Sequence, residues 1–167
     1  KGTIFTVELE LRIPEKQIDG NFWKENGIFH ILAVDDDTDA CENIRFLLES
    51  SGVRTDAAFD GEKAVDLVKK AAESGDDYQV VLLDWNMPGL SGVKAAEQIR
   101  AAVPKDICIL LLTANDWDTI EEEAVHAGID GFLAKPFFVT AFKTKLLEIY
   151  EEENKPDKKF VTSIEKA

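Results

Sequence analysis

The sequence predicts an α/β fold, a doubly wound five-stranded parallel sheet with helices on both faces. Short apolar stretches alternate with longer amphipathic stretches from residue 29 to about residue 152, as in a series of strand–helix–strand units. Several short stretches are apolar throughout, which is typical of strands that helices cover on both faces. Polar residues follow four of these stretches, and parallel strands would bring them to one edge of the sheet.

The first half of the domain, which we expect to span residues 29–152, contains three predicted strands and two predicted helices. Apolar residues of the first helix recur every three or four positions, and Gly52 ends it. Asp60 is the expected N-cap of the second helix, because its side chain can accept a hydrogen bond from a free N–H group there. The expected strands are 30–34, 53–59 and 79–83, and the first helix is expected at 37–50.

The second half continues the alternation with two strands and three helices. Residues 86–92 contain Asn, Pro and Gly and are expected to form a turn, with Ser91 as the N-cap of the next helix. Either Asn115 or Asp116 is expected to cap the helix after that. The expected strands are 107–112 and 131–134, and the expected helices are 92–102, a helix that ends at Ala127 before Gly128, and 137–152.

Two terminal segments lie outside this pattern. Residues 1–13 alternate between apolar and polar side chains, which predicts an extra N-terminal strand that ends before Pro14. Because a single strand is not stable alone, it must pair with this domain or with another copy. Residues 14–28 are polar and are expected to be a linker, and residues 153–167 are expected to form a charged tail.

The composition limits the classes of partner and site. The 167 residues suit one α/β domain plus extra segments. The net charge of −14 argues against nucleic acid and anionic lipid as partners. Cys41 and Cys108 are too few for a zinc site and are expected to be reduced, buried thiols. Because the longest apolar run, 107–112, is too short to cross a membrane, we expect a cytoplasmic domain, although a longer parent protein could be membrane-anchored.

Polar segments at four strand ends predict both a site and a strand order. They are Asp35-Asp36-Asp37 after the first strand, Asp84 after the third, Thr113-Ala114 after the fourth and Lys135-Pro136 after the fifth. The acids after the first and third strands must be neighbours if they are to share a cation. This requirement selects the flavodoxin-like order 2-1-3-4-5, in which the connection reverses between strands one and three.

The acids of this edge are suited to a divalent metal. Asp36 and Asp84 are the expected ligands, because Mg²⁺ prefers oxygen and keeps several waters. The backbone carbonyl of Asn86 could supply a third ligand. Asp35 would act through water or from outside the coordination sphere, and Asp37 could instead be the N-cap of the first helix.

The same edge can accept a phosphoryl group. Asp84 would be the nucleophile, since phosphoryl transfer needs mainly positioning and charge neutralisation. The metal and the Lys135 ammonium would neutralise the phosphoryl oxygens, Thr113 would donate a hydrogen bond to one of them, and the small Ala114 would leave room. Each residue alone has an ordinary explanation as a cap, a solvated side chain or a strand former. Their joint spacing favours a site.

These segments resemble the receiver domain of two-component response regulators. The resemblance rests on residues 31–37, 82–89, 112–114 and 131–137. It implies a phosphorelay protein in which a histidine kinase or a histidine phosphotransfer domain donates a phosphoryl group to Asp84, with Mg²⁺ or Mn²⁺ as cofactor. It also implies a cis peptide bond before Pro136. The family's acidic pair, lysine and switch residues fall on Asp35 and Asp36, on Lys135, and on Thr113 and Phe132.

The resemblance also limits the activity expected of the chain. It implies no enzyme beyond a domain that assists its own phosphorylation and dephosphorylation, and a switched face formed by the fourth helix, fifth strand and fifth helix. One alternative is a phosphatase or phosphotransferase with an aspartyl nucleophile. Such enzymes commonly need a second acid two residues later, where this chain has Asn86. Another alternative is a binding module that keeps the fold without being phosphorylated.

The N-terminal residues carry a second resemblance. Residues 1–11 resemble the closing strand of a histidine kinase ATP-binding domain. This implies that the chain is a piece of a hybrid sensor histidine kinase and contains its receiver. The ATP-contacting segments and the helix with the phosphorylatable histidine are not in this sequence, so we expect no ATP binding by the chain itself. The alternative interpretation is a strand exchanged within a homodimer.

Overall fold

The computed structural model describes residues 21–103, 106–114 and 117–154. Helices and strands alternate through these residues after a short first helix. The elements are α1 (Phe22–Glu25), β1 (His30–Val34), α2 (Thr38–Ser50), β2 (Arg54–Ala58), α3 (Gly61–Ser74), β3 (Val80–Asp84), α4 (Gly92–Ala102), β4 (Cys108–Thr113), α5 (Trp117–His126), β5 (Gly131–Ala134) and α6 (Val139–Glu153).

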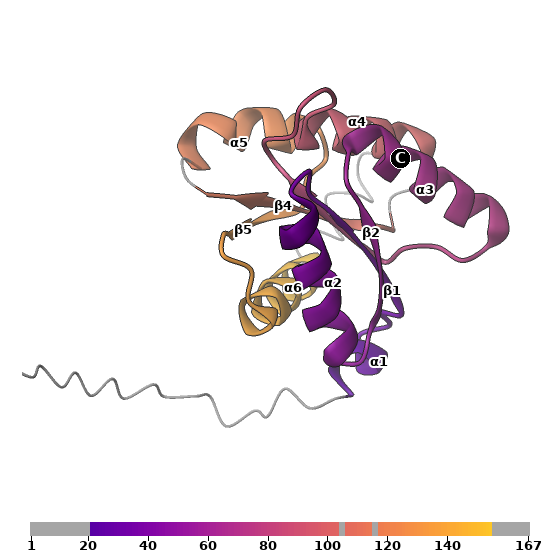
Figure 1. Ribbon diagram of the computed structural model, residues 1–167. Coiled ribbons are helices and arrows are strands. Elements are labelled where there is room, and N and C mark those ends of the chain that lie inside the picture. The colour runs from indigo at the N-terminus through magenta and orange to yellow at the C-terminus, as the bar shows by residue number, and fades with distance from the viewer. Residues whose placement is uncertain (1–20, 104–105, 115–116, 155–167) are drawn as a thin grey trace, which may run out of the picture.

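The five strands form one parallel sheet in the order β2-β1-β3-β4-β5, which confirms the predicted order. Figure 1 shows α3, α4 and α5 on one face of the sheet and α2 and α6 on the other. Successive strand residues point to opposite faces. Leu32 and Val34 therefore pack with α3, α4 and α5, whereas Ile31 and Ala33 pack with α2 and α6. Burial on both faces explains why the central strands are apolar throughout.

Side chains at the predicted positions cap three helices. The Asp60 carboxylate accepts a hydrogen bond from the Lys63 N–H at the start of α3. The Ser91 hydroxyl accepts one from the N–H of Lys94 at the start of α4. Asp37 caps α2 by accepting from two backbone N–H groups. Of the two roles considered for Asp37, the structure therefore supports the N-cap.

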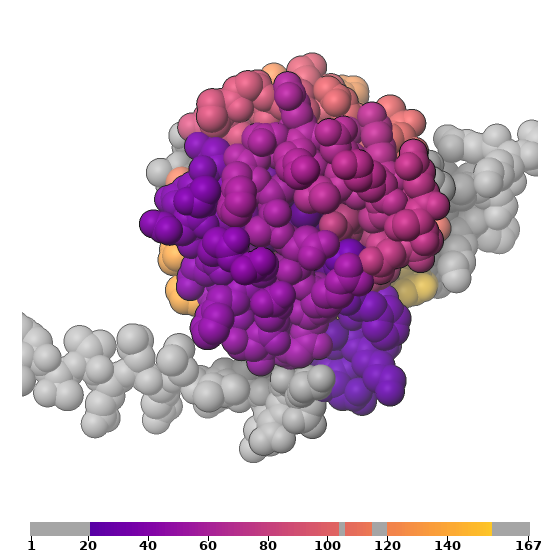
Figure 2. Space-filling model, turned by 45° about the vertical axis from the view of Figure 1, so that its right-hand side comes forward, coloured from indigo at the N-terminus to yellow at the C-terminus, as the bar shows by residue number. Residues whose placement is uncertain are grey.

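The segment expected to be a linker contains a helix that belongs to the core. Phe22 and Trp23 of α1 are buried, and the Trp23 indole N–H donates to the carbonyl oxygen of Ser51 at 3.0 Å. The Trp23 ring also packs against the Phe142 ring of α6, with 5.7 Å between centroids. Figure 2 shows α1, in indigo, at one end of the molecule. The linker prediction is therefore wrong for these residues.

Several strand ends differ by one residue from the prediction. Asp84 is the last residue of β3 and pairs with Leu112, and Thr113 is the last residue of β4 and pairs with Ala134. The ladder extends this far because backbone hydrogen bonding does not depend on whether the side chain is apolar. The predicted strand at 1–13, the caps at 115–116 and the tail from residue 155 lie outside the described residues.

Three further expectations concern the cysteines, the membrane and one peptide bond. Cys41 and Cys108 are both free and buried, as predicted. Among the described residues, we find no helix with the length and apolar character that a membrane span requires. The peptide bond between Lys135 and Pro136 is cis, as the resemblance implied.

Candidate functional site

The sheet brings the predicted polar residues to its carboxyl edge. Asp35 and Asp36 directly follow β1, Asp84 ends β3, Thr113 ends β4, and Lys135 directly follows β5. These four strands are neighbours and run in the same direction. Their ends therefore meet along one line, where open α/β sheets bind ligands.

Three carboxylates form the centre of this edge. Asp35, Asp36 and Asp84 each offer an oxygen, and the three oxygens lie within 4.8 Å of one another. Asp35 and Asp84 are buried, while Asp36 is exposed. Carboxylate oxygens are the ligands that hard divalent cations prefer, and a partly exposed cluster leaves room for waters. The donor set therefore fits Mg²⁺ better than a metal that prefers nitrogen or sulfur.

Lys135 reaches into the same cluster from the end of β5. Its Nζ lies 2.8 Å from Oδ1 of Asp84 and 3.0 Å from Oδ2 of Asp35. The Lys135 side chain is one-third exposed, whereas the two carboxylates are almost fully buried. One ammonium thus bridges acids from two adjacent strands. The sequence predicted that Lys135 lies at this edge, but it did not predict the contact between Lys135 and Asp35.

The cluster contains more acidic than basic side chains. Burial raises the pKa of Asp84, the hydrogen bond from Lys135 opposes that rise, and the nearby Asp35 and Asp36 charges add to it. Burial alone would lower the pKa of Lys135, but hydrogen bonds to Asp84 and Asp35 outweigh it and the pKa is raised. The cluster therefore holds three acids and one ammonium, which pairs with two of them. A divalent metal would offset the remaining repulsion.

Asp35 is also held by the backbone around it. Its Oδ1 accepts a hydrogen bond from the Asp37 N–H at 2.9 Å, and its own N–H donates to the Ala58 carbonyl at 3.2 Å. One Asp35 oxygen thus faces the first turn of α2 and the other faces Lys135. This arrangement favours Asp35 as a residue that orients the site, with Asp36 and Asp84 more available to a metal.

The turn after β3 brings α4 close to Asp84. The Trp85 N–H donates to the Leu112 carbonyl, and the Gly92 N–H donates to the Trp85 carbonyl. A Cβ atom on Gly92 would overlap the carbonyl oxygen of Asp84. Only glycine therefore permits this approach. The sequence predicted Gly92 at the end of the turn and the start of the helix, but it did not predict this close contact. Asn86, in the same turn, is exposed.

The remaining predicted residues lie beside the cluster. Thr113 is buried at the end of β4, and its carbonyl accepts a hydrogen bond from the Lys135 N–H at 2.9 Å. Ala114 follows it and is exposed. Phe132 on β5 is partly buried and packs on the sheet face that α3, α4 and α5 cover. All predicted site residues therefore lie at the carboxyl edge or, for Phe132, on the strand that leads to it.

Comparison with known proteins gives one consistent family. A family model described as the response regulator receiver domain matches residues 31–147. The chain is 36% identical over 123 residues to the chemotaxis protein CheY-3 of Vibrio cholerae, covering 72% of this chain and 91% of the relative. It is 33% identical over 119 residues to the osmosensing histidine protein kinase SLN1 of Saccharomyces cerevisiae, covering 71% of this chain but 10% of that kinase.

A solved structure has the same fold and contains a metal. It is the receiver domain of the sensor histidine kinase PA1611 from Pseudomonas aeruginosa, with a magnesium ion coordinated in its active-site cleft. The two chains are 30% identical with a TM-score of 0.60, over 75% of this chain and 96% of that one.

Proposed function

The chain belongs to the response regulator receiver domain family, which acts in two-component phosphorelay signalling, and we propose that Asp84 is the residue that accepts the phosphoryl group. The observation that carries this proposal is the convergence of charged groups on its carboxylate. Lys135 Nζ lies 2.8 Å from it, and oxygens of Asp35 and Asp36 lie within 4.8 Å. The Lys135 ammonium can neutralise a transferring phosphoryl group, and the acids can hold a divalent cation that adds to this effect.

Each residue around Asp84 would have a separate role in the phosphoryl transfer. One Asp84 carboxylate oxygen attacks phosphorus, the bond from phosphorus to the donor imidazole nitrogen breaks, and its electron pair stays on that nitrogen. Lys135 neutralises negative charge on the phosphoryl oxygens, Thr113 donates a hydrogen bond, and Ala114 leaves room. Asp36, Asp84 and the backbone carbonyl of Asn86 would hold Mg²⁺ or Mn²⁺, which supplies further charge neutralisation when bound.

Thr113 and Phe132 would carry the change away from the site. The Thr113 carbonyl, at the end of β4, accepts the hydrogen bond from the Lys135 N–H. Phe132 lies on the neighbouring strand β5 and is partly buried. A phosphoryl group on Asp84 would draw Thr113 toward it and let Phe132 follow. The surface formed by α5, β5 and α6 would then repack, as a local charge change that biases two states.

Exposed aromatic side chains at this edge support docking of a protein donor. Phe59 follows β2, Trp85 follows Asp84, and Phe138 caps α6, and all three are exposed. We assign this surface to a histidine kinase or a histidine phosphotransfer domain. The similarity to part of a histidine kinase, SLN1, supports a hybrid kinase as the parent, and we extend the proposal to a cytoplasmic location for this domain. Homodimerisation through residues 1–13 stays a prediction, because those residues lie outside the described ones.

Phosphoryl labelling of purified chain tests the proposal. We expect Asp84→Asn to abolish labelling by a phosphorylated histidine kinase or by acetyl phosphate, because the amide cannot form the acyl phosphate. Chelation of Mg²⁺ should have the same effect on the unmodified protein. Asp37→Asn is the matched control, because asparagine also caps a helix, and it should keep its labelling. Undiminished labelling of Asp84→Asn at another residue would refute the assignment.

A further inference from the structure

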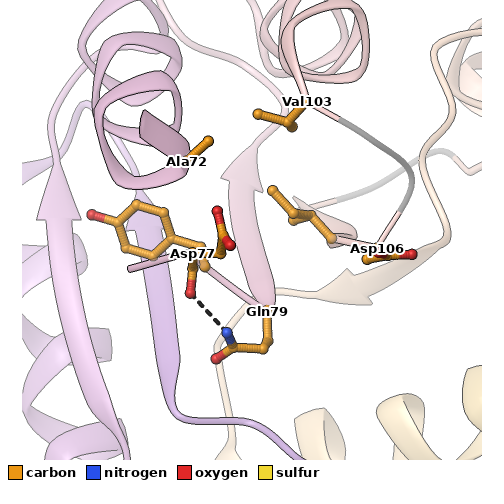
Figure 3. A pocket seen from close by; sticks show the side chains of 7 residues that line it. Ala72, Asp77, Gln79, Val103 and Asp106 are labelled. Carbon is orange, nitrogen blue, oxygen red and sulfur yellow. Dashed lines mark hydrogen bonds between the residues drawn. The ribbon is translucent and has the colours of Figure 1, made fainter. Parts of the chain in front are cut away.

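Two adjoining hollows form a groove at the amino edge of the sheet, opposite Asp84. The first has a volume of about 230 Å³, with Tyr78, Val103 and Ile107 among its lining residues and Asp77 and Asp106 at its rim. In Figure 3 Val103 and Ala72 lie on its upper side, and Asp106 lies beside it. The second hollow, of about 340 Å³, shares Asp106 and Ile107 and extends to Tyr150 and Glu153 of α6. We call the two together the amino-edge groove.

The groove combines an apolar floor with an acidic rim. Tyr78, Val103 and Ile107 are buried beneath it, whereas Asp77 and Asp106 are exposed. Asp130 at the second hollow pairs with Arg100 at 2.6 Å. The other rim acids, Asp77, Asp106 and Glu153, have no ion-pair partner within the described part of the chain. The pKa of the Tyr150 hydroxyl is raised, first by burial and further by the nearby Glu153 and Asp130 charges. The groove therefore favours a basic segment with an apolar side chain.

The chain itself supplies such a segment immediately after α6. Residues 155–167 contain four lysines and two acids, although the whole chain has a net charge of −14. Phe160 follows Lys158 and Lys159 directly. Helix α6 ends at Glu153, which lines the second hollow. An extended chain covers about 3.3–3.6 Å per residue, so the six residues that follow Asn154, up to Phe160, reach about 20 Å. The segment thus starts beside a residue that lines the groove.

We propose that residues 155–167 bind along the amino-edge groove of the same chain. Phe160 covers the apolar floor, and Lys158 and Lys159 face Asp77 and Asp106. The bound segment ties the end of α6 to the loops that precede β3 and β4. Because the groove lies at the opposite edge from Asp84, the bound segment leaves the phosphoryl-acceptor site open.

Amide NMR shifts of the full chain test this binding. Lys158→Glu combined with Lys159→Glu should shift the amide signals of Tyr78 and Ile107, and Phe160→Ser should shift them in the same direction. The control combines Lys63→Glu and Lys94→Glu, which make the same charge change on exposed helical residues near the carboxyl edge, and should leave those signals in place. On the groove side, Asp106→Asn should reproduce the shift at Tyr78, whereas Asp66→Asn on α3 should not.

Two results would overturn the proposal. The first is groove signals that are identical in the unmodified chain and in both tail variants. The second is groove signals that move with protein concentration, which would assign the segment to a second copy of the chain. Binding within one chain predicts groove signals that do not change with protein concentration. It also predicts that high salt moves these signals toward those of the tail variants, because salt screens exposed ion pairs.

Discussion

The two edges of this sheet handle charge in opposite ways. At the carboxyl edge, carboxylate oxygens of Asp35, Asp36 and Asp84 lie within 4.8 Å of one another, Lys135 pairs with two of these acids, and the pKa of Asp84 is raised. At the amino edge the buried His30 lies between two acids, with its Nε2 2.8 Å from Asp56. The carboxyl edge thus keeps an excess of negative charge, whereas the acids around His30 at the amino edge are paired with the chain's own side chains.

A hydrogen-bond network joins the residues around His30 at the amino edge. The Tyr78 hydroxyl donates to the same Asp56 oxygen at 2.7 Å, and the Tyr78 ring stacks on the His30 ring with 4.1 Å between centroids. Arg54 forms an ion pair with Asp76 at 2.9 Å. Like charges thus lie close together at the carboxyl edge, where the proposed metal would relieve their repulsion. The paired residues around His30 contribute stability instead.

The largest effect should come from α1, which packs near the amino edge. Trp23→Ala removes a buried ring, its hydrogen bond to Ser51, and its contact with the Lys143 ammonium, 4.9 Å from the ring centroid. Loss of a buried aromatic side chain typically costs about 3–5 kcal/mol. We expect the free energy of unfolding, measured by urea denaturation, to fall by about that amount.

The matched control is the tryptophan at the other edge. Trp85 is 37% exposed beside Asp84, so Trp85→Ala should cost less than about 1 kcal/mol. Similar losses in the free energy of unfolding for the two variants would contradict this prediction, because they would mean that α1 is not part of the stable core.

The second effect concerns Arg100, which joins three segments at the amino edge. Its guanidinium donates to the Gly128 carbonyl at 2.9 Å, to the Ile107 carbonyl at 2.6 Å and to the Asp130 carboxylate at 2.6 Å. Arg100→Ala removes all three hydrogen bonds, although Asp130 keeps the one from the Ile109 N–H, and we expect a loss of about 2–3 kcal/mol in the free energy of unfolding. Arg45→Ala breaks only an exposed pair with Glu42 and should cost less than about 0.5 kcal/mol. Equal losses would contradict a clamping role for Arg100.

The carboxyl edge could be predicted from the sequence because its information is local. Each polar residue stands at the end of an apolar run, so the runs locate the strands and their ends locate the site. The need for Asp36 and Asp84 to share a cation then fixes the strand order. What the runs did not reveal is the last ladder pair at Asp84 and the bridge from Lys135 to Asp35, because both depend on contacts between strands.

The amino edge could not be predicted because its contacts join distant residues. Trp23 bonds to Ser51, 28 residues away, and Arg100 bonds to Asp130, 30 residues away. Neither pair leaves a periodic signal, and a helix of four residues is too short to show one. Residues 22–25 were therefore included in a linker, although Phe22 and Trp23 were two large apolar residues that a linker does not need.

The smallest effect is the pH dependence of stability without divalent metal. It tests directly whether charges are paired differently at the two edges. The pKa of Asp84 is raised above its ordinary value of 3.8, chiefly by burial, so its ionisation destabilises the folded chain as pH rises above 3.8. Asp84→Asn removes this penalty. We expect the variant to unfold with the same free energy as the unmodified chain near pH 3 and to be more stable at pH 7, by no more than about 1 kcal/mol.

Asp56 at the amino edge should give the opposite sign. Burial would raise its pKa, but hydrogen bonds from Tyr78 and His30 outweigh burial and lower the pKa below 3.8. Its ionised form therefore contributes stability above pH 3.8, and that stability is lost as pH falls through the folded-state pKa. Asp56→Asn should accordingly be less stable than the unmodified chain at pH 7, and the difference should shrink on acidification. Urea denaturation of both variants between pH 3 and pH 7 measures the two slopes. Slopes of the same sign would show that the two edges do not differ in the way their charges are paired.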